Sequence, residues 1–168
     1  MHGEVTIGEK LMLLGPIAPC NIGAVKSAYL HIGDRVTINQ GAAVVAHHGI
    51  EIGDDTLIGE FSAIYDTNYH PVDVDHPTKC APVRIGSNVW LGRNVTVLPG
   101  SRIGDHTVVA VGSVVSGDLP SRVLAVGNPA RPVKRLNSPE GWWRNGRGGP
   151  SGSREAAPAG REGPLPIP

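Results

Sequence analysis

The sequence predicts an all-β fold, namely a parallel β-helix in which the chain winds through triangular coils of short strands. Two observations lead to this prediction. Aliphatic residues recur at every sixth position over long stretches, and this period fits neither an amphipathic helix nor a two-sided strand. Only 3 Trp, 3 Tyr and 1 Phe occur among the 168 residues. The core must therefore consist of Val, Ile, Leu and Ala side chains, whose small volumes suit a thin coil interior.

Residues 85–120 carry the six-residue period without a gap. The first position of every hexad is aliphatic, and we expect it to point inward and stack on its equivalent one coil away. The fifth position is mostly small or β-branched, which suits the tapering space beside it. Gly at the second position, as in Gly86 and Gly92, is expected to supply unusual backbone dihedrals at a corner. The first positions are Ile85, Leu91, Val97, Ile103, Val109 and Val115, and the fifth positions are Val89, Val95, Ser101, Thr107, Ser113 and Leu119.

The same period runs upstream. Before a shift of two residues, His48 falls at a fifth position, so we expect its side chain to lean inward and that of His47 to face a surface or a neighbouring chain. The weaker echoes Ile7-Gly8 and Ile22-Gly23 predict further coil in residues 1–31. The whole pattern predicts about four to five coils of three hexads each. The upstream first positions are Ile32, Ile38, Val44 and Ile50, followed after the shift by Ile52, Ile58 and Ile64.

Residues 66–84 interrupt the repeats and contain Pro71, Pro77 and Pro82. A long irregular insertion in a compact domain is usually functional, so we predict an extruded loop that carries chemistry. His70 lies in this loop, and Pro71 favours an extended backbone for it. A neutral imidazole that titrates near neutral pH is the ordinary general base for a hydroxyl or amine nucleophile. His70 is therefore the first candidate for a catalytic residue.

The C-terminal segment, residues 137–168, contains 13 Gly and Pro among its 32 residues. This composition predicts a flexible tail that follows a β-helix domain formed by residues 1–136. The Trp142-Trp143 pair is unusual in such a tail, and it either docks on the domain or ends a short helix. Arg144 and the three later arginines could contact an anionic partner, although a solvated tail is the simpler interpretation.

Composition excludes several classes of protein. The charges balance, with 15 Lys and Arg against 15 Asp and Glu, which argues against a protein whose main task is to bind nucleic acid. Apolar runs of four or five residues are too short to span a membrane. Cys20 and Cys80 lack the spacing of a disulfide scaffold, so we expect two reduced thiols. With no secretion signal at Met1-His2-Gly3-Glu4, the prediction is a cytoplasmic protein.

A zinc site is the main alternative to a histidine base. Three His ligands could bind zinc, as γ-class carbonic anhydrases do on a β-helix. The spacing of the ligands in those enzymes is not found among the histidines of this chain, and no Cys-rich cluster is present. We therefore expect no metal. The histidines considered were His31, His47, His48, His70 and His76.

Residues 85–136, which read IGSNVWLGRNVTVLPGSRIGDHTVVAVGSVVSGDLPSRVLAVGNPARPVKRL, resemble the C-terminal coils of hexapeptide-repeat acyltransferases. The similar group includes galactoside, maltose and nodulation-type O-acetyltransferases and the capsule and colanic-acid enzymes. The hexads are common to many activities, but the combination of NVWLG, the YHP loop and VGNPARPVK is more specific. The resemblance implies a left-handed β-helix, a homotrimer with active sites between adjacent subunits, and acetyl-CoA as the acyl donor.

The resemblance also implies roles for individual residues. His70, in Asn68-Tyr69-His70-Pro71, matches the catalytic histidine of the loop. On the donor side, Trp90 matches a tryptophan of the donor site, Val111 would contribute its backbone, and two basic residues match positions near the CoA phosphates. On the acceptor side, an asparagine matches one near the acceptor and the catalytic histidine. The donor residues are Trp90, Arg93, Val111, Ser116, Arg131 and Lys134, and the acceptor residues are Asn39, His47, Asp66 and Tyr69.

Two departures from the family pattern bear on the acceptor. His47 lies where galactoside-type enzymes place an acidic residue against the sugar, which argues against a simple galactoside or maltose. The N-terminal helical region of the sugar acetyltransferases is also missing, because residues 1–30 resemble further coil. The group that orients His70 stays open among Asp66, Asp73 and a backbone carbonyl.

The sequence analysis therefore favours an acetyl-CoA-dependent O-acetyltransferase with a small-molecule or glycan acceptor. An N-acetyltransferase of an amino sugar would use the same chemistry. A γ-carbonic-anhydrase-like zinc enzyme and a non-catalytic trimeric scaffold are the other hypotheses. Bound zinc would favour the zinc enzyme. An absence of CoA binding would favour the scaffold.

Overall fold

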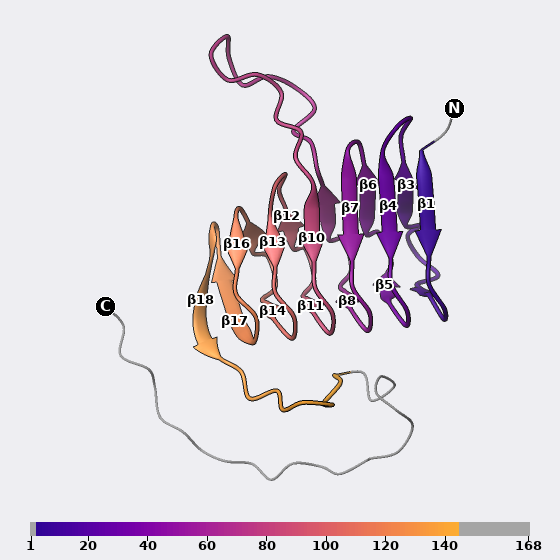
Figure 1. Ribbon diagram of the computed structural model, residues 1–168, viewed down its shortest axis with the longest axis vertical. Coiled ribbons are helices and arrows are strands. Elements are labelled where there is room, and N and C mark those ends of the chain that lie inside the picture. The colour runs from indigo at the N-terminus through magenta and orange to yellow at the C-terminus, as the bar shows by residue number, and fades with distance from the viewer. Residues whose placement is uncertain (1–2, 145–168) are drawn as a thin grey trace.

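In the computed structural model, which describes residues 3–144, the chain winds as a parallel β-helix with three sheets along its axis (Figure 1). Sheet A contains β1 (Glu4–Ile7), β4 (Tyr29–Ile32), β7 (Gly49–Ile52), β10 (Val83–Ile85), β13 (Arg102–Ile103) and β16 (Asp118–Leu119). Sheet B contains β2 (Met12–Leu14), β5 (Thr37–Asn39), β8 (Leu57–Ile58), β11 (Trp90–Leu91), β14 (Val108–Val109), β17 (Val123–Gly127) and β18 (Ala130–Arg135). Sheet C contains β3 (Asn21–Ala24), β6 (Ala43–Ala46), β9 (Ala63–Tyr65), β12 (Thr96–Val97) and β15 (Val114–Val115).

Each coil passes once through the three sheets, and the turns between them form three rows of corners. We call these rows the A–B, B–C and C–A corners. All neighbouring strands pair in parallel except β17 and β18, which form an antiparallel hairpin at the C-terminal end of sheet B. From β1 to β15 the described chain completes five coils of three strands, which confirms the prediction of about four to five coils.

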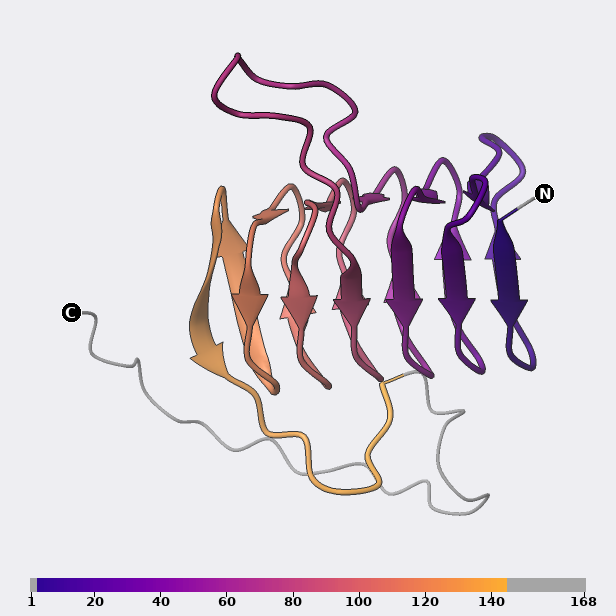
Figure 2. The same ribbon diagram turned by 45° about the horizontal axis from the view of Figure 1, so that its top comes forward.

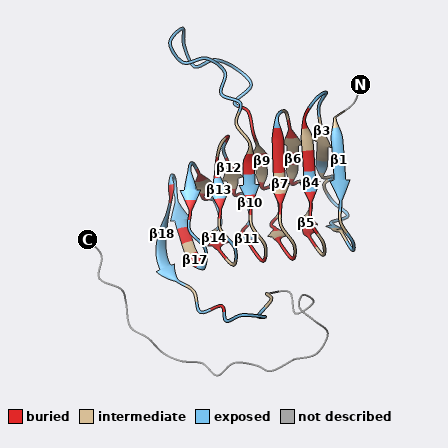
Figure 3. Cartoon of the chain, viewed as in Figure 1, coloured by how far each residue is buried: buried red, intermediate tan, exposed pale blue. Residues whose placement is uncertain are grey.

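The aliphatic first positions form the core, as predicted. In sheet B, Ile38, Ile58, Leu91 and Val109 lie in one register row and are buried. Equivalent rows in the other two sheets hold the remaining first positions, and Figure 3 shows the buried residues along the inside of the coils. Removing these stacked side chains from water is the main favourable contribution to folding.

The two-residue shift in the repeat has a simple structural origin. β7 is four residues long, so Ile50 and Ile52 both point inward, paired with Leu30 and Ile32 of β4. The prediction that His48 leans inward is wrong, because its side chain is exposed. The two extra residues lengthen β7. The corner before β7 is held by backbone hydrogen bonds to Asp66, which are described below.

Buried hydroxyl groups at the fifth positions are hydrogen-bonded, and most of them donate to a backbone carbonyl. The hydroxyl of Thr56 donates to the carbonyl of Gly86 at 2.9 Å, that of Ser62 donates to Gly92 at 2.9 Å, and that of Thr107 donates to Pro120 at 2.7 Å. Each acceptor belongs to the next coil. A small side chain at this position therefore fills the corner and also ties adjacent coils together.

The second-position glycines serve a purpose that the sequence analysis did not predict. They do not adopt a positive φ; the positive φ falls two residues later, for example at Arg35, Asn88 and His106. Glycine is needed at the second position because a Cβ would collide with the backbone of the next coil. A Cβ on Gly59 would lie 2.6 Å from the carbonyl carbon of Gly92.

The first coil is open to solvent at its outer edge. Val5, Ile7 and Leu13 stack inward on Leu30, Ile32 and Ile38 but are 43%, 48% and 56% exposed, since no described coil covers them. The predicted coil in residues 1–31 is thus confirmed for residue 3 onward. No helix of residues 3–144 is long and apolar enough to cross a membrane.

After β18 the chain turns back along the A–B corners. Residues 137–144, which we call the strap, cross these corners in order. The side chain of Arg122 donates to Ser138 O at 3.0 Å, the Trp143 ring lies 5.8 Å from the His106 ring, and Asn88 binds the backbone of Trp142 and Arg144. Docking of the Trp pair on the domain is therefore what the structure shows. The rest of the predicted tail, 145–168, lies outside the described residues.

Candidate functional site

The extruded loop rises from the C–A corner between β9 and β10, as the repeat interruption predicted (Figures 1 and 2). Its two arms form a hydrogen-bonded stem, residues 66–68 and 79–81. Ala81 N donates to Asp66 O at 2.9 Å, Asn68 N donates to Lys79 O at 3.1 Å, and Lys79 N donates to the Asn68 side chain at 2.7 Å. The stem holds the following residues, Tyr69 and His70, directly above the coils.

His70 is exposed, and its backbone N–H donates to Asn68 O at 2.7 Å. Tyr69 adopts a φ of 62° and turns its ring toward the coils, edge-on to His47 at 4.8 Å and to Tyr65 at 5.7 Å. Burial, with the nearby Tyr65 and Asp66, raises the pKa of Tyr69. Three residues named from the sequence, His47, Tyr69 and His70, are thus brought to one corner.

Asp66 anchors this corner from inside. Its side chain is fully buried and accepts three backbone N–H bonds, from His47 at 2.8 Å, His48 at 2.7 Å and Gly49 at 2.6 Å. The prediction that Asp66 contacts the acceptor is corrected here, because both carboxyl oxygens are occupied and out of reach of solvent. Asp66 instead fixes the turn that presents His47.

Two of the three groups considered for orienting His70 are engaged elsewhere. Asp66 binds backbone amides, and Asp73 binds Nδ1 of His76 at 2.7 Å. That bond lowers the pKa of the Asp73 carboxyl. Among the described residues neither carboxyl group is hydrogen-bonded to the His70 ring, and no backbone carbonyl is bonded to it either.

The predicted donor residues Trp90 and Lys134 share one face of sheet B. Across the sheet, Lys134 pairs with Leu124, Leu124 with Val108, and Val108 with Trp90. The neighbouring row, which includes Leu91, is buried, so this row faces outward and Trp90 is 44% exposed. Three strand spacings separate Trp90 from Lys134, or about 14 Å. Arg131 is exposed on the same hairpin strand, β18.

The other predicted donor and acceptor residues lie at corners. Arg93 and Val111 follow β11 and β14 at the B–C corners, where the Arg93 guanidinium lies 5.8 Å from the Phe61 ring. Val111 is 66% exposed. Asn39 lies at an earlier B–C corner and donates to Ile58 O at 3.0 Å, which ties two coils together. Ser116 follows β15 at a C–A corner and is exposed.

The predicted base, His70, and the predicted donor residue Trp90 do not meet within one chain. The loop with His70 stands at the C–A end of sheet A, whereas Trp90 begins β11 at the opposite, A–B end, and Figures 1 and 2 agree on this separation. Neither of two hollows found among the described residues, one near Lys10 and Met12 and one near Glu51 and Asp54, contains a predicted site residue. His70 and Trp90 therefore lie at separate corners of the described chain.

Metal-ligating groups do not cluster in the part of the chain that the structure describes. No three His, Cys, Asp or Glu side chains of residues 3–144 are placed to share a metal ion. The zinc alternative therefore has no preformed ligand set in this region.

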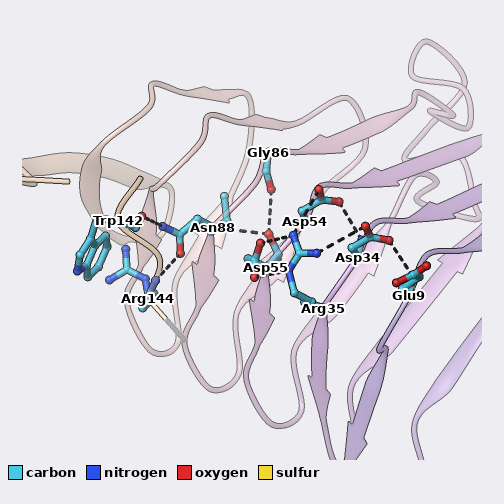
Figure 4. Close-up of polar contacts among 11 residues, drawn as sticks. Glu9, Asp34, Arg35, Asp54, Asp55, Gly86, Asn88, Trp142 and Arg144 are labelled. Atoms are coloured by element: carbon cyan, nitrogen blue, oxygen red, sulfur yellow. Dashed lines mark hydrogen bonds and ion pairs between the residues drawn. The ribbon is translucent and has the colours of Figure 1, made fainter. Parts of the chain in front are cut away.

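Sequence reasoning missed the strap contacts at Trp90. The Arg144 guanidinium lies 6.0 Å from the Trp90 ring and 5.0 Å from the Trp142 ring, and the Asn88 side chain binds the strap backbone (Figure 4). The Trp142-Trp143 pair was the only signal in the sequence, since the contacts join residues more than fifty positions apart. These contacts place a cation beside a predicted donor residue.

Comparisons with known proteins give one consistent result. Residues 82–117 match the family described as "Bacterial transferase hexapeptide (six repeats)". A putative acetyltransferase of Saccharomyces cerevisiae is 35% identical over 122 residues, 70% of this chain and 62% of that protein. The galactoside O-acetyltransferase of Escherichia coli is 33% identical over 111 residues, 64% of this chain and 55% of that protein. The chain thus spans about 60% of the length of these curated relatives.

A solved structure covers more of the fold. The hexapeptide-repeat acetyltransferase of Vibrio cholerae is 34% identical, with a TM-score of 0.68 over 79% of this chain and 74% of that one. Its complex with acetyl coenzyme A matches with a TM-score of 0.66. The left-handed hand of the β-helix, which hexad spacing does not determine, is the hand of this fold. From the fold, the repeat and these similarities together, the chain belongs to the hexapeptide-repeat acetyltransferases.

Proposed function

We propose that this protein transfers an acetyl group from acetyl-CoA to a hydroxyl of a sugar-containing acceptor, with His70 as the general base. The observation that carries the proposal is the position of His70. It is exposed on a hydrogen-bonded stem, it takes no part in the core, and the ring of its neighbour Tyr69 contacts His47. The acetyl coenzyme A complex of the Vibrio cholerae protein supports the choice of donor.

The reaction follows from the chemistry of an imidazole. His70 removes the proton of the acceptor hydroxyl as its oxygen attacks the thioester carbon. The tetrahedral intermediate collapses, the C–S bond breaks, and the proton passes from His70 to the departing thiolate. General-base help of this kind contributes about 10²- to 10⁴-fold to the rate. Holding donor and acceptor together at one corner contributes further, because the encounter becomes local.

A homotrimer with shared sites would complete this arrangement. The loop with His70 leaves a C–A corner, whereas Trp90 follows an A–B corner, so we propose that the loop of one copy meets the donor face of its neighbour. Trp90, Arg131 and Lys134 would line the donor, with the two cations toward its phosphates. Arg93, Ser116 and the backbone of Val111 are further proposed contacts with CoA.

The acceptor is proposed to lie against Asn39, His47 and Tyr69. His47 offers an imidazole where galactoside-type relatives have a carboxyl group, so an acceptor with an acidic or phosphorylated sugar fits better than a neutral disaccharide. The same base would serve an amine nucleophile, so an amino sugar is the alternative acceptor. A cytoplasmic location remains part of the proposal.

The first experiment is calorimetric titration with acetyl-CoA. We expect micromolar binding by the natural sequence and clearly weaker binding by Trp90→Ala. If the natural sequence does not bind acetyl-CoA, the proposed function is wrong, and metal analysis becomes the next step.

The second experiment tests the base. His70→Ala is expected to keep acetyl-CoA binding and to lose at least about 100-fold in turnover. His76→Ala is the matched control, since it removes a histidine from the same loop, six residues away. Near-normal turnover by His70→Ala would show that another group is the base.

The third experiment tests whether sites are shared between copies. Equal amounts of the His70→Ala and Trp90→Ala variants are mixed, unfolded and then refolded together. If each site takes His70 from one copy and Trp90 from the next, random mixing restores about a quarter of the sites. If both residues act within one chain, every site lacks one of them, and the mixture shows only the average activity of the two variants refolded separately.

A further inference from the structure

Arg144 is a cation without an anion in the described part of the chain. Its guanidinium is half-buried between two indole rings, and the single hydrogen bond recorded for it runs from Nη2 to His106 O at 3.3 Å. Nε is buried and has no acceptor, and the same is true of Nε1 of Trp143 beside it. A partly buried charge of this kind is costly unless an anion pairs with it.

Another arginine on the same row of corners shows the usual solution. Arg35 binds Asp55 through two bonds of 3.0 and 2.8 Å, with Asp34 and Asp54 at 3.6 and 3.8 Å (Figure 4). Its pKa is raised, chiefly by Asp55. For Arg144 the pKa is lowered, and burial is the sole cause. The fold therefore pairs Arg35 with carboxyl groups of its own chain, whereas Arg144 has no such partner among the described residues.

The surroundings of Arg144 are cationic and aromatic. Arg122 donates to the strap at Ser138, and burial, Arg122 and Arg144 lower the pKa of His106 against the opposing effect of Asp105. Trp90 and Trp142 remain 44% and 37% exposed next to the guanidinium. A planar cation held between indole rings at a surface is well suited to bind phosphate oxygens, because Arg donors match their geometry.

We propose that Arg144 is a donor-binding residue that contacts a phosphate of acetyl-CoA bound along the outer face of sheet B. The inference rests on the proposed function. It adds the strap to the donor site, so that Arg144 beside Trp90 and the row that leads from Trp90 to Lys134 would together line the donor. The strap is held in place by Asn88, whose side chain receives the Arg144 N–H at 3.0 Å and donates to Trp142 O at 3.0 Å.

The test compares donors with and without phosphate. Binding of acetyl-CoA and of acetyl-pantetheine is measured by calorimetry for the natural sequence, Arg144→Gln and Arg144→Lys. Arg102→Gln is the matched control, because Arg102 is an arginine of sheet A whose only recorded ion pair, with Asp118 at 4.0 Å, is exposed. We expect Arg144→Gln to weaken acetyl-CoA about tenfold, as for one lost charge-assisted hydrogen bond. Acetyl-pantetheine binding should not change, and Arg144→Lys should recover part of the loss.

Each other outcome overturns the inference. Equal weakening of both donors by Arg144→Gln would mean that Arg144 only packs on Trp90. An unchanged affinity for acetyl-CoA, with a larger fraction of dissociated copies in sedimentation, would mean that its anion is a carboxyl group of a neighbouring copy. In both cases the natural sequence still binds acetyl-CoA, so the proposed function survives. Failure of the natural sequence to bind acetyl-CoA would instead remove the proposed function.

Discussion

Replacement of Asp66 is the most informative perturbation of the fold, because one side chain fixes the corner that carries His47. Asp66→Ala removes three hydrogen bonds, of 2.8, 2.7 and 2.6 Å, from the backbone N–H groups of His47, His48 and Gly49. Water can solvate the first two amides, since His47 is half-buried and His48 exposed, whereas Gly49 is buried. At about 1–2 kcal/mol for each bond, the free energy of unfolding should fall by about 3–6 kcal/mol.

Asp66→Asn provides the graded comparison. One amide oxygen can still accept from two N–H groups, but its NH₂ faces the third donor, so a smaller loss of about 1–3 kcal/mol is expected. Urea denaturation at one fixed protein concentration measures both losses, because association in the proposed homotrimer would contribute to apparent stability. Hydrogen exchange at His47, His48 and Gly49 reports the same change locally.

Two results would refute this reasoning. If both variants unfold within about 0.5 kcal/mol of the natural sequence, the three bonds do not stabilise the corner. If stability falls but exchange at the three amides is unchanged, the loss arises elsewhere. Turnover should fall with both substitutions, because the corner positions His47 beside Tyr69.

Three further predictions concern the coils and the strap. Ile58→Ala, at a fully buried position, should cost about 2–5 kcal/mol in urea denaturation, and a loss under 1 kcal/mol would mean that the stack collapses around the cavity. Gly59→Ala should destabilise more than Gly23→Ala, since a Cβ on Gly59 meets backbone at 2.6 Å and one on Gly23 meets open space, with neither glycine at a positive φ; equal losses would contradict the steric explanation. Burial, with Arg122 and Arg144, lowers the pKa of His106 beneath the docked strap. Protonation therefore opposes docking: the contribution of neutral His106 is fully present above the ordinary pKa of about 6.5 and decreases as the pH falls toward the lowered pKa. Hydrogen exchange at the Arg144 amide between pH 7.5 and 5, expressed as protection relative to the intrinsic exchange rate at each pH, measures this, and protection that does not change with pH would contradict it.

The repeat in the sequence determines the coil. Aliphatic residues at first positions, such as Ile58, Leu91 and Val109, are inward and stacked because a six-residue period leaves only one face of each short strand buried. The extruded loop was also predictable, since residues 66–84 lack the repeat. The family was recognised from the motifs NVWLG, YHP and VGNPARPVK, and the left-handed sense of the β-helix was inferred from the family.

Only the tertiary structure decided how the corners are built. Second-position glycines are required by the backbone of the next coil, a contact between residues such as Gly59 and Gly92 that no local pattern reveals. Asp66 lies in the loop segment by sequence, yet its side chain turns inward and holds a corner formed almost twenty residues earlier. The strap brings Arg144 to Trp90, more than fifty residues away. The reason is physical: periodicity specifies which face of a strand is buried, whereas a hydrogen bond or a cation beside an indole depends on which coils become neighbours.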